Sequence, residues 1–203
     1  FLLLVVFVCT YIPFVYSNNY YVTSINDSGL NSLRAAIDSA NTNTGTDSII
    51  LLLTVNDTIH LRSSLPTITE AVIISGQPCQ NPTISGDTLT YRKGAFNASN
   101  IGSPITLNYL NVFNCAPNGG ALGGSAVWGD TVILNHCFFY GNQTYTPHYG
   151  SGIGGAVYAG TIWANDCSFS NNRCTSHPLS DAHAGAAIGA RTMYLNRCVF
   201  CDN

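Results

Sequence analysis

Three side chains with acid–base character recur at one position of a sequence repeat: His136, Asp166 and Arg197. If the copies stack, alternating charges at the spacing of neighbouring strands would shift the pKa of each group, so this set is the best catalytic candidate. The alternative is an exposed ladder of opposite charges that contributes about 0–1 kcal/mol per pair. We favour the ladder.

A polysaccharide-cleaving enzyme needs more acids than this set supplies. Glycoside hydrolases use two carboxylates roughly 5–9 Å apart, and lyases need several acids around a calcium ion together with a base. Asp130 aligns with Gly160 and Arg191, no two acids align in neighbouring copies, and Glu70 is the only glutamate. We therefore predict no cofactor, while a lyase or hydrolase with carboxylates converging from loops stays open.

Two loops of the repeat also gather possible metal ligands. His177, Asp181 and His183 lie in one loop, and His148 occupies the equivalent loop one copy earlier. Polar loops produce such sets by chance, so we predict no metal site.

A recurring set of large apolar side chains points to binding. Ile133, Trp163 and Tyr194 each lie between two apolar residues expected to face inward, so strand alternation directs them outward. An outward stack of rings is a platform for sugar or protein, because aromatic side chains dominate recognition surfaces. Cover by an adjacent loop or domain is the alternative.

All of these residues belong to a repeat of about thirty residues. Ungapped copies begin at Ala126, Ala156 and Ala187, 30 and then 31 residues apart, and share the pattern Ala-[Val/Ile]-x3-Thr-apolar-x-apolar-Asn-x-Cys-x-Phe-x-x-Asn. A degenerate earlier copy starts at Ile105, so the regular repeats span about 105–203.

The pattern within one copy predicts strands that stack. Each copy holds two short runs of alternating apolar and polar residues and no helical spacing. Such strands bury their apolar side only when coils pile up, with equivalent residues about 4.8 Å apart, which predicts a parallel β-helix. The predicted inward columns are Val132/Ile162/Met193, Leu134/Ala164/Leu195 and Phe139/Phe169/Phe200.

Two further columns have structural interpretations. An asparagine ladder is expected at a bend, because a stacked amide both donates and accepts along the column. Its members are Asn108, Asn135, Asn165 and Asn196. Stacked cysteines would lie within disulfide range, yet three cannot all pair, so buried free thiols are favoured. Their positions are Cys137, Cys167 and Cys198.

Composition excludes several classes of protein. Only 17 of 203 residues are charged, the net charge is −3 and no basic run exists, which argues against nucleic-acid binding. A long solvated helix or coiled coil would need more Glu and Lys. Uncharged polar residues interleaved with apolar ones suit strands and turns instead.

The chain begins with an apolar run, residues 1–17, which we interpret as a signal peptide clipped at its own start. Val15 and Ser17 precede Asn18 at the small-residue spacing of a signal-peptidase site, and a transmembrane anchor is the alternative. The domain would span 18–203, with no membrane span, as a fragment truncated at its C-terminus. Sequons at Asn26, Asn56, Asn97 and Asn142 are possible glycosylation sites in a eukaryotic host.

A short amphipathic helix is expected at about 31–41, with Asn31 or Ser32 as its N-cap and Gly45 as its stop, where it would cover the first coil. Its apolar spacing runs over Leu30, Leu33, Ala36, Ile37 and Ala40.

The segment Ser32-Leu-Arg-Ala-Ala-Ile37 resembles the Ser-Leu-Arg-x-Ala-Ile cap segment of secreted bacterial right-handed β-helix repeat proteins. Gly154-Gly-Ala-Val157 and Phe169-Ser-Asn-Asn172 resemble motifs of chlamydial polymorphic outer membrane proteins. The resemblance implies an all-β fold, a right-handed parallel β-helix. Most proteins of this kind are non-catalytic passenger or adhesin domains, and the resemblance implies such a role here. We therefore expect a secreted or cell-surface protein, at the outer membrane if bacterial, that binds a host or neighbouring cell-surface glycan or protein through a rigid face and loops.

Overall fold

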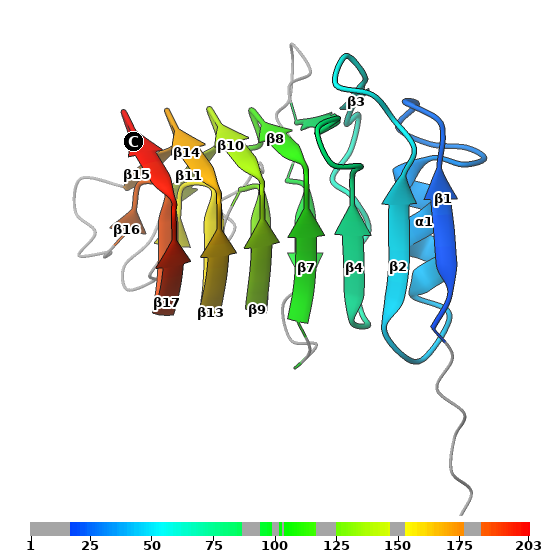
Figure 1. The fold of residues 1–203 in the computed structure, drawn as a ribbon. Helices are drawn as coiled ribbons and strands as arrows, with labels where there is room; N and C mark the ends of the chain where they lie inside the picture. Colours follow the sequence, from blue (N-terminus) through cyan, green and yellow to red (C-terminus); the bar gives the residue numbers. More distant parts are fainter. Residues whose placement is uncertain are drawn as a thin grey trace, which may run out of the picture.

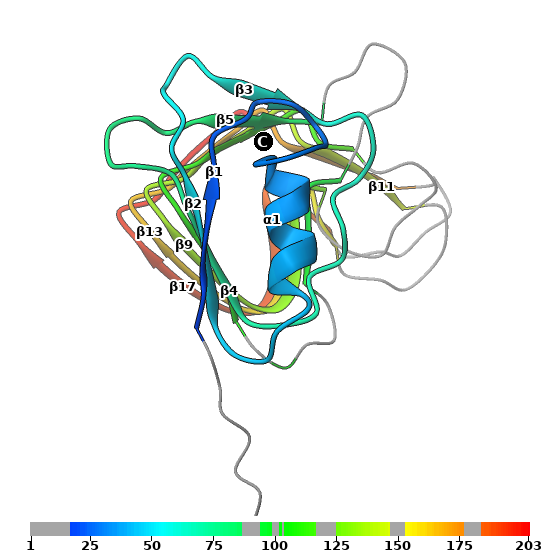
Figure 2. The same ribbon diagram turned by 90° about the vertical axis from the view of Figure 1, so that its right-hand side faces the viewer.

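The chain winds into a right-handed parallel β-helix, which confirms the predicted fold class. The structure is a computed structural model, and it describes residues 17–86, 94–98, 102, 104–116, 125–146, 153–176 and 184–203. Figure 1 shows the strands side by side along the axis from β1 to β17, and Figure 2 looks along that axis onto the single described helix, α1 (Leu33–Ala40). No helix in these ranges has the length and hydropathy to cross a bilayer.

The broadest wall of the β-helix is a parallel sheet, here called sheet 1. Its strands follow one another in the order β1 (Asn19–Val22), β2 (Asp47–Leu51), β4 (Val72–Ser75), β7 (Pro104–Asn108), β9 (Val127–Asn135), β13 (Val157–Asn165) and β17 (Ile188–Asn196). β6 (Phe96–Ala98) pairs with the first part of β9 and β7 with the second, so in that coil the equivalent of one long strand is divided in two.

The second wall, sheet 2, consists of three-residue strands. Its order is β18 (Val199–Cys201), β14 (Ser168–Ser170), β10 (Phe138–Tyr140), β8 (Asn111–Phe113), β5 (Thr83–Ser85) and β3 (Thr58–His60). Two short parallel pairs complete the later coils, β11 (Gln143–Thr146) with β15 (Arg173–Ser176) and β12 (Ile153–Gly154) with β16 (Ala184–Gly185).

The repeat copies lie in register, residue on residue. Trp163 pairs with Ile133 on one side and with Tyr194 on the other, and the rest of β13 follows the same offset. The predicted inward columns are buried through the second copy, and the Phe139 and Phe169 rings stack with centroids 5.1 Å apart. Met193, Leu195 and Phe200 are 44–47% exposed, because no described strand pairs with the far edge of β17 or β18.

The bend between the two sheets holds the asparagine ladder. The side-chain amide of Asn135 donates to Asn108 at 2.8 Å, that of Asn165 to Asn135 at 3.1 Å and that of Asn196 to Asn165 at 3.4 Å. Asn108 donates in turn to the Ser75 hydroxyl at 2.9 Å. Each amide therefore links two successive coils, as the column of equal residues predicted.

A second amide ladder, which the sequence analysis missed, lies inside the bend after sheet 2. The Asn142 side chain is fully buried and donates to the Val112 carbonyl and to Asn172 Oδ1, at 2.9 and 3.0 Å. The Asn172 side chain donates in the same way to the Phe139 carbonyl and to Asn203 Oδ1, at 3.0 and 2.9 Å. These amides bond to the carbonyls of buried residues one coil earlier and so tie successive coils together.

Burial of Asn142 makes one prediction wrong. An Asn-linked glycan is bulky and needs a surface position, and this amide is sealed inside the coil, so the sequon at Asn142 is no glycosylation site in the folded protein. Asn26 and Asn56 are exposed and Asn97 is half-buried, and for these the interpretation stays a prediction.

The cysteine column faces the interior and holds free thiols. Cys137 and Cys167 are buried, Cys198 is half-buried in the last coil, and each Sγ lies 3.2–3.5 Å from backbone carbonyl oxygens. Burial raises the pKa of Cys137 well above its usual value. The column acts as small apolar filling.

The helix α1 covers the open first coil (Figure 2). The Ser32 hydroxyl accepts from the Ala35 N–H at 3.2 Å as the N-cap, and the helix ends at the C-cap Asn41, before the predicted stop Gly45. Leu30 lies outside the helix and is 87% exposed, so its place on the apolar face was a wrong prediction. The helix begins after Ser32 because the Ser32 side chain supplies an acceptor that the backbone N–H groups of the first turn otherwise lack.

We expect Asn172→Ala to destabilise the protein by about 2–4 kcal/mol, because it leaves buried backbone groups of two coils without partners. Asn171→Gly is the matched control: Asn171 is exposed with a φ of 53°, a conformation that glycine adopts freely. Chemical denaturation would measure both. Equal stability of Asn172→Ala and the control would contradict a structural role for the buried ladder.

Candidate functional site

The candidate catalytic residues do come together, at the bend that follows the asparagine ladder. His136, Asp166 and Arg197 each adopt a left-handed backbone with φ of 51–53°, and Tyr109 takes the same place one coil earlier with φ of 54°. This conformation turns the chain from sheet 1 into sheet 2 and directs the four side chains outward in one column. Tyr109 was missed, although it follows Asn108 as His136 follows Asn135.

The four side chains contact one another along the axis. The Tyr109 and His136 rings stack with centroids 4.7 Å apart and an interplanar angle of 2°. His136 Nε2 lies 3.8 Å from Asp166 Oδ2, and Arg197 holds both Asp166 oxygens through Nε and Nη2 at 2.5 Å. The column is thus a continuous stack, exposed at His136 and Arg197 and half-buried at Tyr109 and Asp166, that ends in a bidentate ion pair.

The electrostatics of this column do not favour general acid catalysis. The Arg197 guanidinium holds the pKa of Asp166 below its usual value, with a smaller contribution from His136, and the carboxylate raises the pKa of Arg197. The general acid of a glycoside hydrolase needs a raised pKa and a second carboxylate nearby. The groups that shift the pKa of Asp166 include no other carboxylate.

The predicted binding column lies on the outer face of sheet 1. The Trp163 and Tyr194 rings stack with centroids 3.8 Å apart and an interplanar angle of 14°, and their side chains are 45% and 48% exposed. Ile133, next in the column, is half-buried. Because the two rings face each other, they present their edges to solvent.

The same face carries a second aromatic column that the sequence analysis did not single out. Trp128 and Tyr158 are cross-strand partners, both are half-buried, and each lies between buried residues of its own strand. Both stand two residues after the first alanine of a copy, and this shared position could have identified them. The pattern was hidden because the copy that begins at Ala187 has Gly189 at this position. β13 therefore carries an outward aromatic residue toward each end.

Another aromatic cluster was also missed, on the outer face of sheet 2. Phe113 contacts Phe138 and Tyr140 edge-on, with centroids 5.5 and 5.9 Å apart. It breaks off at β14, where Ser168 and Ser170 occupy the equivalent positions. The repeat pattern hides it because these positions are not shared among copies.

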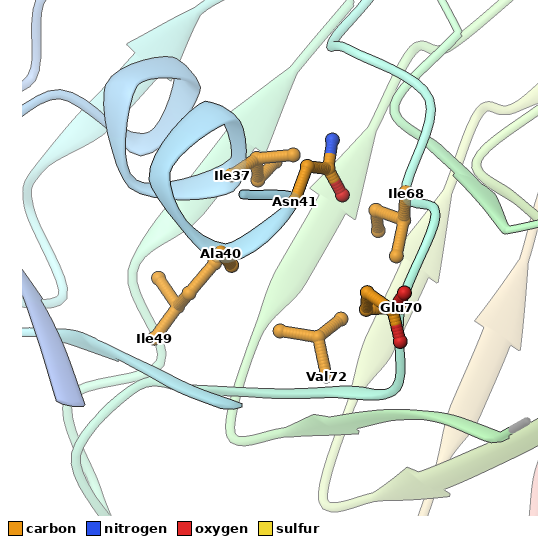
Figure 3. A pocket seen from close by; sticks show the side chains of 7 residues that line it. All are labelled: Ile37, Ala40, Asn41, Ile49, Ile68, Glu70 and Val72. Atoms are coloured by element: carbon orange, nitrogen blue, oxygen red, sulfur yellow. The ribbon is translucent and has the colours of Figure 1, made fainter. Parts of the chain in front are cut away.

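The described residues hold no group of three metal-ligating side chains, and His148, His177, Asp181 and His183 lie outside them. The pocket between α1 and the first coils, lined by Ile37, Ile68 and Val72 among others, is a packing gap too narrow for a water molecule (Figure 3). A second, open pocket of about 290 Å³ lies between β1 and α1, and neither pocket is lined by residues of the outward columns, so the candidate site described above is a surface.

Comparison with protein-family profiles, with curated proteins and with solved structures finds no match to this chain.

We expect the carboxyl of Asp166 to titrate below its usual value, and to titrate higher in Arg197→Gln, which removes the guanidinium. A lowered folded-state pKa stabilises the protein above the unfolded-state value, and this contribution is lost as pH falls through the folded pKa. Carbon-detected NMR titration would measure both midpoints, with Arg191→Gln on sheet 1 as the control. Identical midpoints in the parent and Arg197→Gln would contradict the ion pair.

Proposed function

We propose that this protein is a secreted or cell-surface β-helix repeat protein, adhesin-like or passenger-like, that binds a neutral cell-surface glycan on the outer face of sheet 1. The observation that carries the proposal is the exposed, stacked pair of Trp163 and Tyr194 on two paired strands. Aromatic side chains supply large contact areas at a small entropic cost. Here the backbone pairing already holds them in place.

The chemistry around the pair favours an uncharged ligand. β13 carries no charged residue, and β9 and β17 carry one each, Asp130 and Arg191. Hydroxyl and amide side chains flank the rings on both sides along the strands. Their members are Thr161, Thr192, Asn165 and Asn196. Such groups hydrogen-bond sugar hydroxyls, while the exposed ring edges supply apolar contact for the C–H groups of a sugar ring.

The cellular setting belongs to the same proposal. Residues 1–17 would direct secretion as a signal peptide. Attachment to the cell surface, at the outer membrane in a bacterial host, would present the long rigid face to neighbouring cells. The resemblance of the cap segment and repeat motifs to secreted β-helix passengers supports this setting.

We expect Trp163→Ala and Tyr194→Ala each to weaken binding to a glycan by about tenfold or more, because truncating a central aromatic residue costs over 1 kcal/mol. Tyr140→Ala, an exposed tyrosine on sheet 2, is the matched control and should bind normally. A glycan array followed by titration of the strongest hit would measure this. Unchanged binding in both sheet 1 variants would remove this face from the proposal, and binding to cell-surface protein alone would replace the glycan as ligand.

A polysaccharide lyase or hydrolase remains the competing function because His136, Asp166 and Arg197 meet at one bend. It predicts release of reducing or unsaturated sugar ends from polysaccharides such as pectin. Loss of that release in Asp166→Asn, with Asp130→Asn still active, would support the enzyme over the binding protein.

A further inference from the structure

One buried carboxylate in the cap has an incomplete set of partners. Asp47, the first residue of β2, has no solvent exposure. Its Oδ1 accepts from the backbone N–H of Asn18 at 2.7 Å, while Oδ2 is buried with no hydrogen-bond partner among the described residues. A buried carboxylate held by a single neutral N–H is costly, since an ionised group out of water needs an opposite charge or several donors.

No charged side chain of the neighbouring elements supplies what Asp47 lacks. The charged residues on the elements packed against β2 are Arg34 and Asp38 of α1 and Glu70, just ahead of β4. Arg34 is committed to Asp27 at 2.7 Å and to the carbonyls of the 63–64 turn. No hydrogen bond or ion pair joins Asp38 or Glu70 to Asp47 within the described residues.

The backbone nitrogen of Asn18 is the group best placed to supply the positive charge and the additional hydrogen bonds that Asp47 lacks. The Asn18 carbonyl accepts from the Ser48 N–H at 2.8 Å, and the strand that follows, β1, pairs in parallel with β2. The backbone on both sides of the contact is therefore fixed, so Asn18 N stays at Asp47 whatever precedes it. Ser17, the residue before, is exposed.

The same Asn18 follows the predicted end of the signal peptide, with Val15 and Ser17 at the spacing of a signal-peptidase site. We propose that cleavage between Ser17 and Asn18 creates an α-ammonium group that forms an ion pair with the buried carboxylate of Asp47. Removal of the leader would then complete the cap of the β-helix.

The step is an ordinary peptide hydrolysis. A signal peptidase adds one water across the bond: the C–N bond breaks, the hydroxyl goes to the Ser17 carbonyl carbon and the remaining hydrogen of the water goes to the nitrogen of Asn18. At neutral pH the new Ser17 carboxyl group gives up its proton, and the released amine takes up a second proton to become an ammonium. The ammonium has three N–H donors where the peptide had one, so it can serve both Asp47 oxygens, and it carries the opposite charge.

The consequence is a cap whose stability depends on processing. Before cleavage, Asp47 is buried with one hydrogen bond; after it, the same carboxylate is fully paired. The precursor therefore has a lower free energy of unfolding while the leader is attached, and the mature chain gains stability when the leader is removed.

Two experiments test this. First, intact mass and N-terminal sequencing of the protein secreted from its full precursor should place the mature N-terminus at Asn18, and any other start would overturn the proposal. Second, the mature chain, released from a fusion cut directly before Asn18, is compared with a chain that carries Gly-Ser-Gly-Ser before Asn18. The extension should lower the midpoint of thermal unfolding by about 5–10 °C, as breaking a buried pair does.

The variant Asp47→Asn makes the second experiment specific. In that background the extension should change the midpoint by less than about 2 °C, because no carboxylate remains to pair. Asp38→Asn, an exposed carboxylate on α1, is the control and should keep the full effect. An extension effect of equal size with and without Asp47, or none in either, would overturn the ion pair.

A pH series on the chains with unchanged Asp47 gives a readout that does not depend on the variant folding. Pairing raises the folded-state pKa of the α-amino group above its unfolded value of about 7.7–8.0. The advantage of the mature chain over the extended one is therefore full at pH 7 and is lost as pH rises through the folded pKa. An advantage unchanged up to pH 10 would overturn the proposal.

Discussion

In-register stacking of parallel coils is the constraint on which the rest of this structure depends. The residues of β13 lie between their equivalents in β9 and β17, so each side chain has the same position of the repeat above and below it. A residue type that can hydrogen-bond to or pack against a second copy of itself then forms a stable column through successive coils. Amides do so by donating and accepting, phenylalanine rings by stacking, and cysteines by filling narrow space. This explains why few charges are tolerated: like charges in one column would repel at strand spacing.

The same constraint shapes the outer surface. The stack that ends in Asp166 and Arg197 places two rings and then two opposite charges along one bend, so each charge meets an opposite or neutral neighbour. Such an arrangement neutralises the column and leaves no free acid. On sheet 1, stacking turns Trp163 and Tyr194 toward each other and gives a flat, weakly charged face. A long face with rigid spacing suits contact with an extended ligand better than enclosure of a small one.

Sequence patterns predicted several of the features that recur in the copies, but not all of them, and missed those that occur once. The three copies fixed the coil, the asparagine ladder at Asn135 and the outward direction of Trp163, because each is repeated at one position. Asn142 was predicted to be a glycosylation site because the local sequon motif carries no information on burial. Its equivalents Asn172 and Asn203 recur in the later copies and could have indicated the buried ladder. The Phe113 cluster and the contact between Asn18 and Asp47 join positions that no repeat relates, so only coordinates reveal them.

The most direct test of the account is the register itself. Long-range NOEs between backbone amides of residues 30 or 31 apart, measured on deuterated protein, should link Ile133 to Trp163 and Trp163 to Tyr194. Their presence along all of β13 is the predicted result, since paired strands lie about 4.8 Å apart. NOEs confined within each copy, or offset by one residue, would contradict the stacked columns and the binding face built on them.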